Sequence, residues 1–152
     1  MKRYIVDSNL YIQAIRDRPA VAALSEFSVS YAPNLLLHAV VVQELMAGAI
    51  NQQARSRLER NLITPLERRG RLLVPTYRAW KRAGEIIATL IQRRHLSVTG
   101  VPRSFPNDAL IAASCREQGV TLITENEADF AKISLVEPID FVTDWPRKHP
   151  ES

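Results

Sequence analysis

Short apolar runs alternate along this chain with longer segments of helical periodicity. Runs rich in β-branched and aliphatic residues predict four strands, at residues 4–6, 34–41, 72–74 and 120–123. The clearest helix covers residues 79–93, where apolar side chains recur at helical spacing on one face. Strands that alternate with helices form a mainly parallel sheet that is covered on both faces. The sequence therefore predicts an α/β fold, a three-layer α/β/α sandwich around a small, mainly parallel sheet.

The remaining segments complete this arrangement. Further helices are predicted at residues 19–27, 42–50, 52–69 (one amphipathic helix, or two joined near Pro65), 108–118 and 125–131, and weaker strands at 135–136 and 139–142. Glycine and proline interrupt the pattern over residues 95–106, which predicts a loop. The 152 residues fit one domain, expected over residues 1–145, followed by a flexible tail over residues 146–152.

The composition excludes several classes of protein. The single cysteine, Cys115, rules out an internal disulfide and with it a disulfide-stapled secreted domain. The longest apolar run, residues 35–42, is too short to span a bilayer, and no signal peptide is recognisable, so we expect a cytoplasmic protein with no membrane partner. The net charge of +4 permits a polyanionic partner without requiring one.

Acidic residues follow the predicted strands or stand near helix starts. Asp7 follows the first strand, and Glu44 lies in the first turn of the helix predicted after the second. Asp108 opens a helix, and Asp129 follows the strand at residues 120–123, with Asn126 beside it. Ligands of open α/β sheets bind beyond the carboxyl ends of the strands, so these side chains are expected to converge there. Converging carboxylates repel one another unless a cation is present, and Mg²⁺ or Mn²⁺ prefers such oxygen ligands. A metal-bound water could then hydrolyse a phosphodiester.

Each of these acids also has a structural explanation. Asp7 and Asp108 can cap helices, Glu44 can be favoured by a helix dipole, and Asp129 can be a surface residue. Spacing alone does not decide between these roles. Four further side chains are predicted to be structural rather than functional, namely His38, Trp80, Cys115 and Trp145.

Four sequence blocks contain these acids and span nearly the whole chain. The first and second are Ile5-Val6-Asp7-Ser8-Asn9 and the segment from Val42 to Gly48, which contains Glu44-Leu45. The third runs from Asn107-Asp108 to Ala113, and the fourth is Leu122-Ile123-Thr124-Glu125-Asn126-Glu127-Ala128-Asp129-Phe130. Together these blocks resemble the PIN-domain family, in which they occur in the same order, with VapC-type toxins as the nearest subgroup.

This resemblance implies a metal-dependent ribonuclease. It assigns Asp7, Glu44 and Asp108 as the main acids of a Mg²⁺ or Mn²⁺ site. For the fourth position we predict Asp129 as the carboxylate and Asn126 as a supporting ligand or water anchor, although some members carry an acid where this chain has Asn126. The resemblance also implies that three polar side chains orient the carboxylates, namely Ser8, Asn9 and Thr124.

The resemblance further implies an RNA substrate, a cognate antitoxin partner in a type II toxin–antitoxin system, and a homodimer. Candidate contacts to RNA phosphates are Arg16, Arg18, Arg93, Arg94 and Arg103, each of which can equally be a solvated surface charge. The loop over residues 95–106 looks longer than is usual in the family, so its contribution to RNA access or antitoxin docking stays open.

Two alternatives remain. The chain could be a non-catalytic module that binds RNA or protein on a PIN scaffold, but its intact set of acids argues against this. A nucleotide-binding or phosphoacceptor α/β domain is disfavoured because the chain has neither a Gly-x-Gly-x-x-Gly sequence nor a P-loop.

Overall fold

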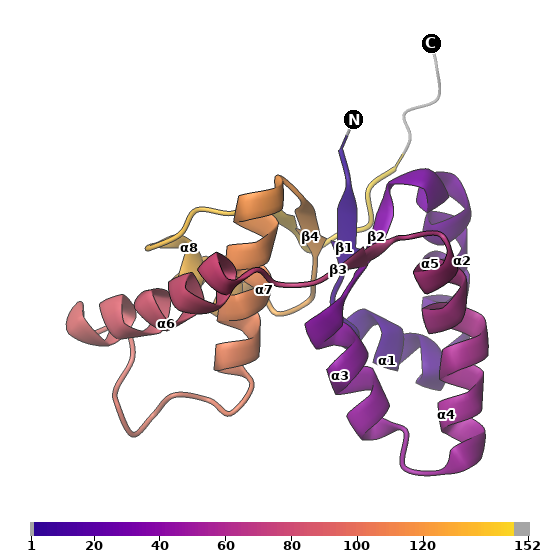
Figure 1. The fold of residues 1–152 in the computed structure, drawn as a ribbon, viewed down its shortest axis with the longest axis horizontal. Helices are drawn as coiled ribbons and strands as arrows, with labels where there is room; N and C mark the ends of the chain where they lie inside the picture. The colour runs from indigo at the N-terminus through magenta and orange to yellow at the C-terminus, as the bar shows by residue number, and fades with distance from the viewer. Residues whose placement is uncertain (1, 148–152) are drawn as a thin grey trace.

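A computed structural model describes residues 2–147 and contains one five-stranded sheet (Figure 1). The strand order is β3-β2-β1-β4-β5, and all four pairings are parallel. The strands are β1 (Tyr4–Val6), β2 (Leu35–His38), β3 (Leu72–Leu73), β4 (Thr121–Ile123) and β5 (Phe141–Val142). The predicted small parallel sheet is therefore confirmed.

The helices cover both faces of this sheet. The chain steps outward from β1 through β2 to β3, then returns to the other side of β1 as β4. Because crossovers between parallel strands are right-handed, reversing the direction of travel places the later helices on the opposite face. One face carries α1 (Ser8–Arg16), α2 (Arg18–Tyr31), α3 (Ala39–Gly48), α4 (Gln52–Leu58) and α5 (Thr64–Arg68). The other carries α6 (Tyr77–Gln92), α7 (Phe105–Gln118) and α8 (Glu127–Ser134), as Figure 1 shows.

Helix α7 is the most deeply buried helix of the described chain. Every residue from Asp108 to Cys115 is buried, and Phe105 and Ile111 are fully excluded from solvent. A helix that is buried on nearly all sides shows little amphipathic periodicity. Gly119 ends α7 with a φ of 65°, which a residue without a side chain adopts at little cost. The buried position of Cys115 agrees with its predicted structural role.

Helices α4 and α5 form one continuous helical stretch that is interrupted by a π-helical turn, η2 (Glu59–Ile63). The amide of Thr64 donates to Glu59 O, five residues back. Pro65 has no amide hydrogen, and its ring crowds the carbonyl four residues before it, so a locally wider turn relieves that clash. The predicted helix over 52–69 therefore exists, with a change of geometry immediately before its proline.

Several predicted boundaries are wrong. The strand expected at 34–41 ends at His38, where the ring Nδ1 accepts a hydrogen bond from Val40 N and caps α3. Residues 135–136 form a turn rather than a strand, and α2 continues to Tyr31 instead of ending at 27. Tertiary burial of β-branched residues in α3 overrides their local preference for strands. The predicted tail begins at Pro146, and residues 148–152 lie outside the described residues.

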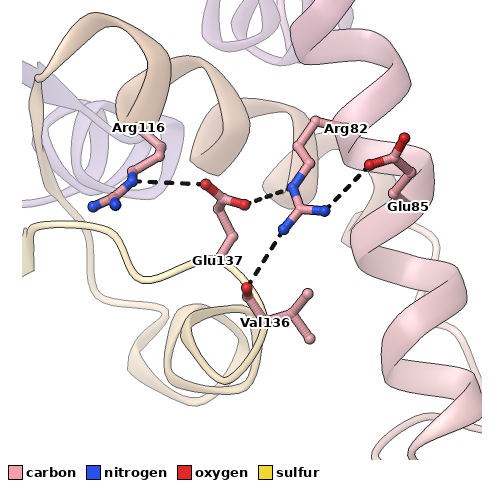
Figure 2. A network of polar contacts seen from close by, with 5 residues as sticks. All are labelled: Arg82, Glu85, Arg116, Val136 and Glu137. Carbon is pink, nitrogen blue, oxygen red and sulfur yellow. Dashed lines mark hydrogen bonds and ion pairs between the residues drawn. The ribbon is translucent and has the colours of Figure 1, made fainter.

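An ion-pair network joins α6, α7 and the segment after α8 (Figure 2). Glu137 lies between two arginines, with 2.5 Å to Arg82 Nε and 3.7 Å to Arg116 Nε. Arg82 also contacts Glu85 Oε2 at 3.2 Å and donates to the carbonyl of Val136. The network fixes the chain between α8 and β5 against α6 and α7.

The two tryptophans differ. Trp145 packs on Phe27 with ring centroids 4.8 Å apart, as predicted. Trp80 is 61% exposed, so its predicted packing role is wrong, because it lies on the outer face of α6. Among residues 2–147, no helix is both long and apolar enough to cross a membrane.

Candidate active site

The order of the strands reverses between β1 and β4, and the candidate site begins where these two strands end. Val6 and Ile123 are register partners, so the next residues, Asp7 and Thr124, emerge side by side. The amide of Asp7 donates to Ile123 O at 2.9 Å, which extends the pairing of β1 with β4 by one residue. Both side chains are buried. A reversal of strand order is the position at which open α/β sheets bind ligands.

Hydrogen bonds orient the Asp7 carboxylate on both of its oxygens. Oδ1 accepts from Ser8 N at 2.8 Å, so Asp7 also serves as the N-cap of α1. Oδ2 accepts from Thr124 Oγ1 at 2.7 Å and from Asn9 Nδ2 at 3.4 Å. The capping role and the site role of Asp7 are therefore compatible.

Asn126 joins two further carboxylates. Its Nδ2 donates to Asp108 Oδ2 at 3.2 Å and to Asp129 Oδ2 at 3.0 Å, which uses both hydrogens of the amide. Its own backbone amide donates to Thr124 Oγ1 at 3.0 Å. Thr124 therefore links Asp7 to the pair formed by Asp108 and Asp129. Asp108 lies in the first turn of α7, and Asp129 lies in the first turn of α8.

Glu44 approaches this group from α3. Its Oε1 accepts from Ser8 Oγ at 3.3 Å. The predicted place of Glu44 in the first turn of a helix is wrong, because α3 begins at Ala39 and Glu44 lies in its second turn. From the second turn of α3 the Glu44 side chain still reaches Ser8 on α1, because α3 packs against α1.

Burial and mutual repulsion alter the protonation of these acids. Burial raises the pKa of Asp7, and burial together with the nearby charge of Asp7 raises the pKa of Glu44. For Asp108, burial first and then the charges of Asp7, Asp129 and Glu44 raise the pKa to about 8. The four predicted acids thus interact electrostatically although they come from four separate segments of the chain.

The donor chemistry of this cluster fits a hard cation. It offers carboxylate oxygens, and the buried Asn9 Oδ1 has no hydrogen-bond partner. Within residues 2–147, however, no three His, Cys, Asp or Glu side chains are arranged as a metal-binding group. The carboxylates therefore repel one another without forming a ready set of ligands.

The five arginines predicted to contact RNA do not join this cluster. All five are exposed, and none forms an ion pair within the part of the chain described. Sequence analysis also missed a contact beside the site, in which Gln13 Nε2 donates to Glu125 Oε2 and ties α1 to the loop after β4. The two residues are 112 positions apart, and although Glu125 stands in the fourth sequence block, Gln13 belongs to no motif, so no local signal identified the pair.

A three-layer α/β fold with acidic side chains at its central carboxyl edge defines a recognisable class of domain. The model of the PIN domain family matches residues 4–135, and the chain belongs to that family. A search of curated proteins finds no significant match.

Solved structures of the same fold extend over almost the whole chain. A chain of DNA-bound VapBC from Salmonella typhimurium is 25% identical, with a TM-score of 0.67, covering 96% of this chain and 100% of that one. A chain of VapBC-1 from nontypeable Haemophilus influenzae is 23% identical, with a TM-score of 0.64, covering 93% and 97%. A chain of FitAcB from Neisseria gonorrhoeae is 18% identical, with a TM-score of 0.64, covering 91% and 95%.

Proposed function

We propose that this protein is an endoribonuclease that depends on Mg²⁺ or Mn²⁺ and acts as the toxin of a type II toxin–antitoxin system. One observation carries the proposal, namely that hydrogen bonds through Ser8, Thr124 and Asn126 bring the carboxylates of Asp7, Glu44, Asp108 and Asp129 together at the carboxyl edge of the sheet. Among the described residues no ion pair neutralises these four acids, so they repel one another, and a bound cation would relieve that repulsion.

The residues divide into two roles. Asp7, Glu44, Asp108 and Asp129 would hold the cation. Ser8, Asn9, Thr124 and Asn126 would position these carboxylates, through the hydrogen bonds that they already donate. A cation bound here would lower the pKa of a water molecule and stabilise charge on the phosphate.

The chain's own groups define the state before a cation binds. Asp108, with a pKa of about 8, retains its proton through most of the neutral range. The amide of Asn126 donates to Asp108 and Asp129, so it holds these two carboxylates beside each other. Thr124 donates its only hydroxyl hydrogen to Asp7, which leaves the lone pairs of Thr124 for the amides of Asn9 and Asn126.

The similar solved structures support an antitoxin partner. They come from VapBC and FitAB complexes, and one of 24% identity is described as a toxin–antitoxin complex from Klebsiella pneumoniae. We propose that this chain likewise pairs with an antitoxin that blocks its site. Assembly as a homodimer and a cytoplasmic location stay predictions.

The test is RNA cleavage in Mn²⁺ by the wild type and by Asp7→Asn and Asp129→Asn. Each of the two variants should lose at least about a hundredfold in rate, since each removes one charge from the proposed ligand set. Glu127→Gln is the matched control, because Glu127 is an exposed acid in the first turn of the same helix as Asp129. Equal cleavage by the wild type and Asp7→Asn would reject the site.

The alternative is a non-catalytic module that binds RNA or protein, and the lack of a ready ligand group among the described residues favours it. A calorimetric titration with Mn²⁺ distinguishes the two functions. Binding that is lost in Asp108→Asn supports the nuclease, whereas no binding at millimolar Mn²⁺ supports the module.

A further inference from the structure

A second feature lies outside the carboxylate cluster, on the helical stretch from Gln52 to Arg69. A groove of about 900 Å³ runs along α4, η2 and α5. Four arginines line it, Arg55, Arg60, Arg68 and Arg69, and Glu59 is the only acid among the described residues that line it. The groove is therefore strongly basic, in contrast to the acidic edge of the sheet.

The arginines come from all three parts of the helical stretch and line the same groove. Arg55 lies on α4, Arg60 within the π-helical turn, and Arg68 on α5. The opposite face carries Ile63 and Leu66, which are buried in the core. The basic face is thus fixed by burial of the apolar one, and it cannot turn inward.

None of these arginines forms an ion pair with another residue of the described chain. All four are exposed, and the ion pairs among residues 2–147 involve other cations, Lys2, Arg82 and Arg116. Glu59 offsets at most one of four positive charges. Guanidinium groups pair with phosphates through two parallel hydrogen bonds, so phosphate is the anion that this set suits best.

The groove has the length of a bound strand of several nucleotides. From Arg55 to Arg68 the helix rises roughly 20 Å. Single-stranded nucleic acids are commonly held by basic grooves that follow several successive phosphates. The stretch is also close in the chain to the acidic edge, because α3, which carries Glu44, leads into α4 and packs against it.

We propose that this groove binds the phosphates of an RNA strand that is cleaved at the carboxylate edge. The inference rests on the proposed function and adds to it a substrate-holding surface. An acidic segment of a protein partner is the competing occupant. RNA is favoured because guanidinium groups pair with phosphates through two parallel hydrogen bonds, and a strand presents several successive phosphates to a basic groove.

The test is binding of a fluorescent RNA of about 16 nucleotides by the full chain in EDTA, which removes metal-dependent cleavage. The groove variant combines Arg55→Gln, Arg60→Gln and Arg68→Gln. The control combines Arg57→Gln, Arg78→Gln and Lys81→Gln, which are exposed cations outside the groove and outside every ion pair of the described chain. Both variants lose three positive charges, so they change the overall attraction to RNA equally.

The groove variant should bind RNA at least about tenfold more weakly, and the slope of log affinity against log salt should fall by about 2. The control should change affinity less than about threefold. Equal affinities for the two variants would overturn the proposal, provided that both keep the melting temperature of the wild type. Unchanged RNA binding with lost binding of polyglutamate would overturn it in favour of an acidic protein segment.

Cleavage by the wild type in Mn²⁺ separates this inference from the function on which it rests. If the wild type cleaves RNA and the groove variant binds like the control, only the groove assignment fails. If the wild type neither binds nor cleaves RNA, the proposed function fails and the groove assignment fails with it.

Discussion

The hydroxyl of Thr124 donates a 2.7 Å hydrogen bond to Oδ2 of Asp7, joining two residues that are 117 positions apart. Both follow the last residues of paired central strands, and Thr124 is completely buried. The bond therefore fixes the position of the Asp7 carboxylate relative to the sheet.

Loss of this hydroxyl should impair the site without unfolding the protein. Thr124→Val keeps the shape of the side chain but removes the donor to Asp7, so Mn²⁺ affinity and the rate of RNA cleavage should fall by about 10- to 100-fold. Titration calorimetry and a cleavage assay measure the two effects. Thr124→Ser retains the hydroxyl and should recover most of the affinity. A Thr124→Val variant with wild-type Mn²⁺ affinity would contradict the positioning role.

Removal of the Asp108 charge should stabilise the metal-free protein. The folded-state pKa of about 8 lies above the ordinary value of 3.8 for an aspartate, so the native state binds more protons between these pH values. The contribution of Asp108 to the free energy of unfolding is therefore present at low pH and is lost as pH rises from about 4 to 8. In EDTA at pH 8, Asp108→Asn should unfold with a free energy about 1–3 kcal/mol above that of the wild type.

Denaturant unfolding at pH 4 and pH 8 checks this expectation, because the difference between the two proteins should nearly vanish at pH 4. Saturating Mn²⁺ should make the wild type more stable than Asp108→Asn at neutral pH. At a hundred times the dissociation constant it adds about 2.7 kcal/mol to the wild type and little to the variant. A wild type that is more stable than Asp108→Asn in EDTA at pH 8 would refute the repulsion within the site.

His38 should produce the opposite dependence on pH. Burial lowers its pKa to about 4, because the ring is fully enclosed and its Nδ1 must stay unprotonated to accept from Val40 N. Stability from this group is present above about 6.5 and is lost as pH falls toward 4. Between these two pH values the protein should lose about 3 kcal/mol of unfolding free energy through His38.

His38→Asn isolates this contribution. Asparagine can cap α3 through its side-chain oxygen but does not titrate, so the wild type should lose more stability than the variant between pH 7 and pH 4. Chemical denaturation across this range supplies the measurement. Parallel pH profiles for the two proteins would show that His38 is not held neutral by the fold.

The Arg82–Glu137 pair should be coupled more strongly than the Arg82–Glu85 pair. The Glu137 side chain is only 15% exposed, whereas that of Glu85 is 50% exposed and better screened by water. A double-mutant cycle with alanine should give about 1 kcal/mol for the first pair and below about 0.5 kcal/mol for the second. High salt should weaken both. Equal couplings would mean that the burial of Glu137 adds nothing to its ion pair.

Local pattern was sufficient for much of this protein. Alternating strands and helices predicted the layered parallel fold, because the periods of side-chain direction differ between the two elements. Recognition of the family depended on short motifs around Asp7, Glu44, Asp108 and Asp129. Glu44, Asp108 and Asp129 lie in helices, as predicted, and Asp7 directly follows the first strand. The ends of helices and strands were predicted less accurately. The strand predicted to continue past His38 ends there, because a run of buried apolar residues occurs in helices as well as in strands.

Tertiary structure decided how these pieces meet. Only the register of β1 with β4 places Thr124 beside Asp7, and only the meeting of α7, α8 and the loop after β4 lets Asn126 join two carboxylates. The same holds for the basic groove, whose arginines are ordinary surface charges in the sequence. Neighbours along the chain determine periodicity, but the pKa of Asp108 depends on charges from distant segments, whose separation is known only once the chain has folded.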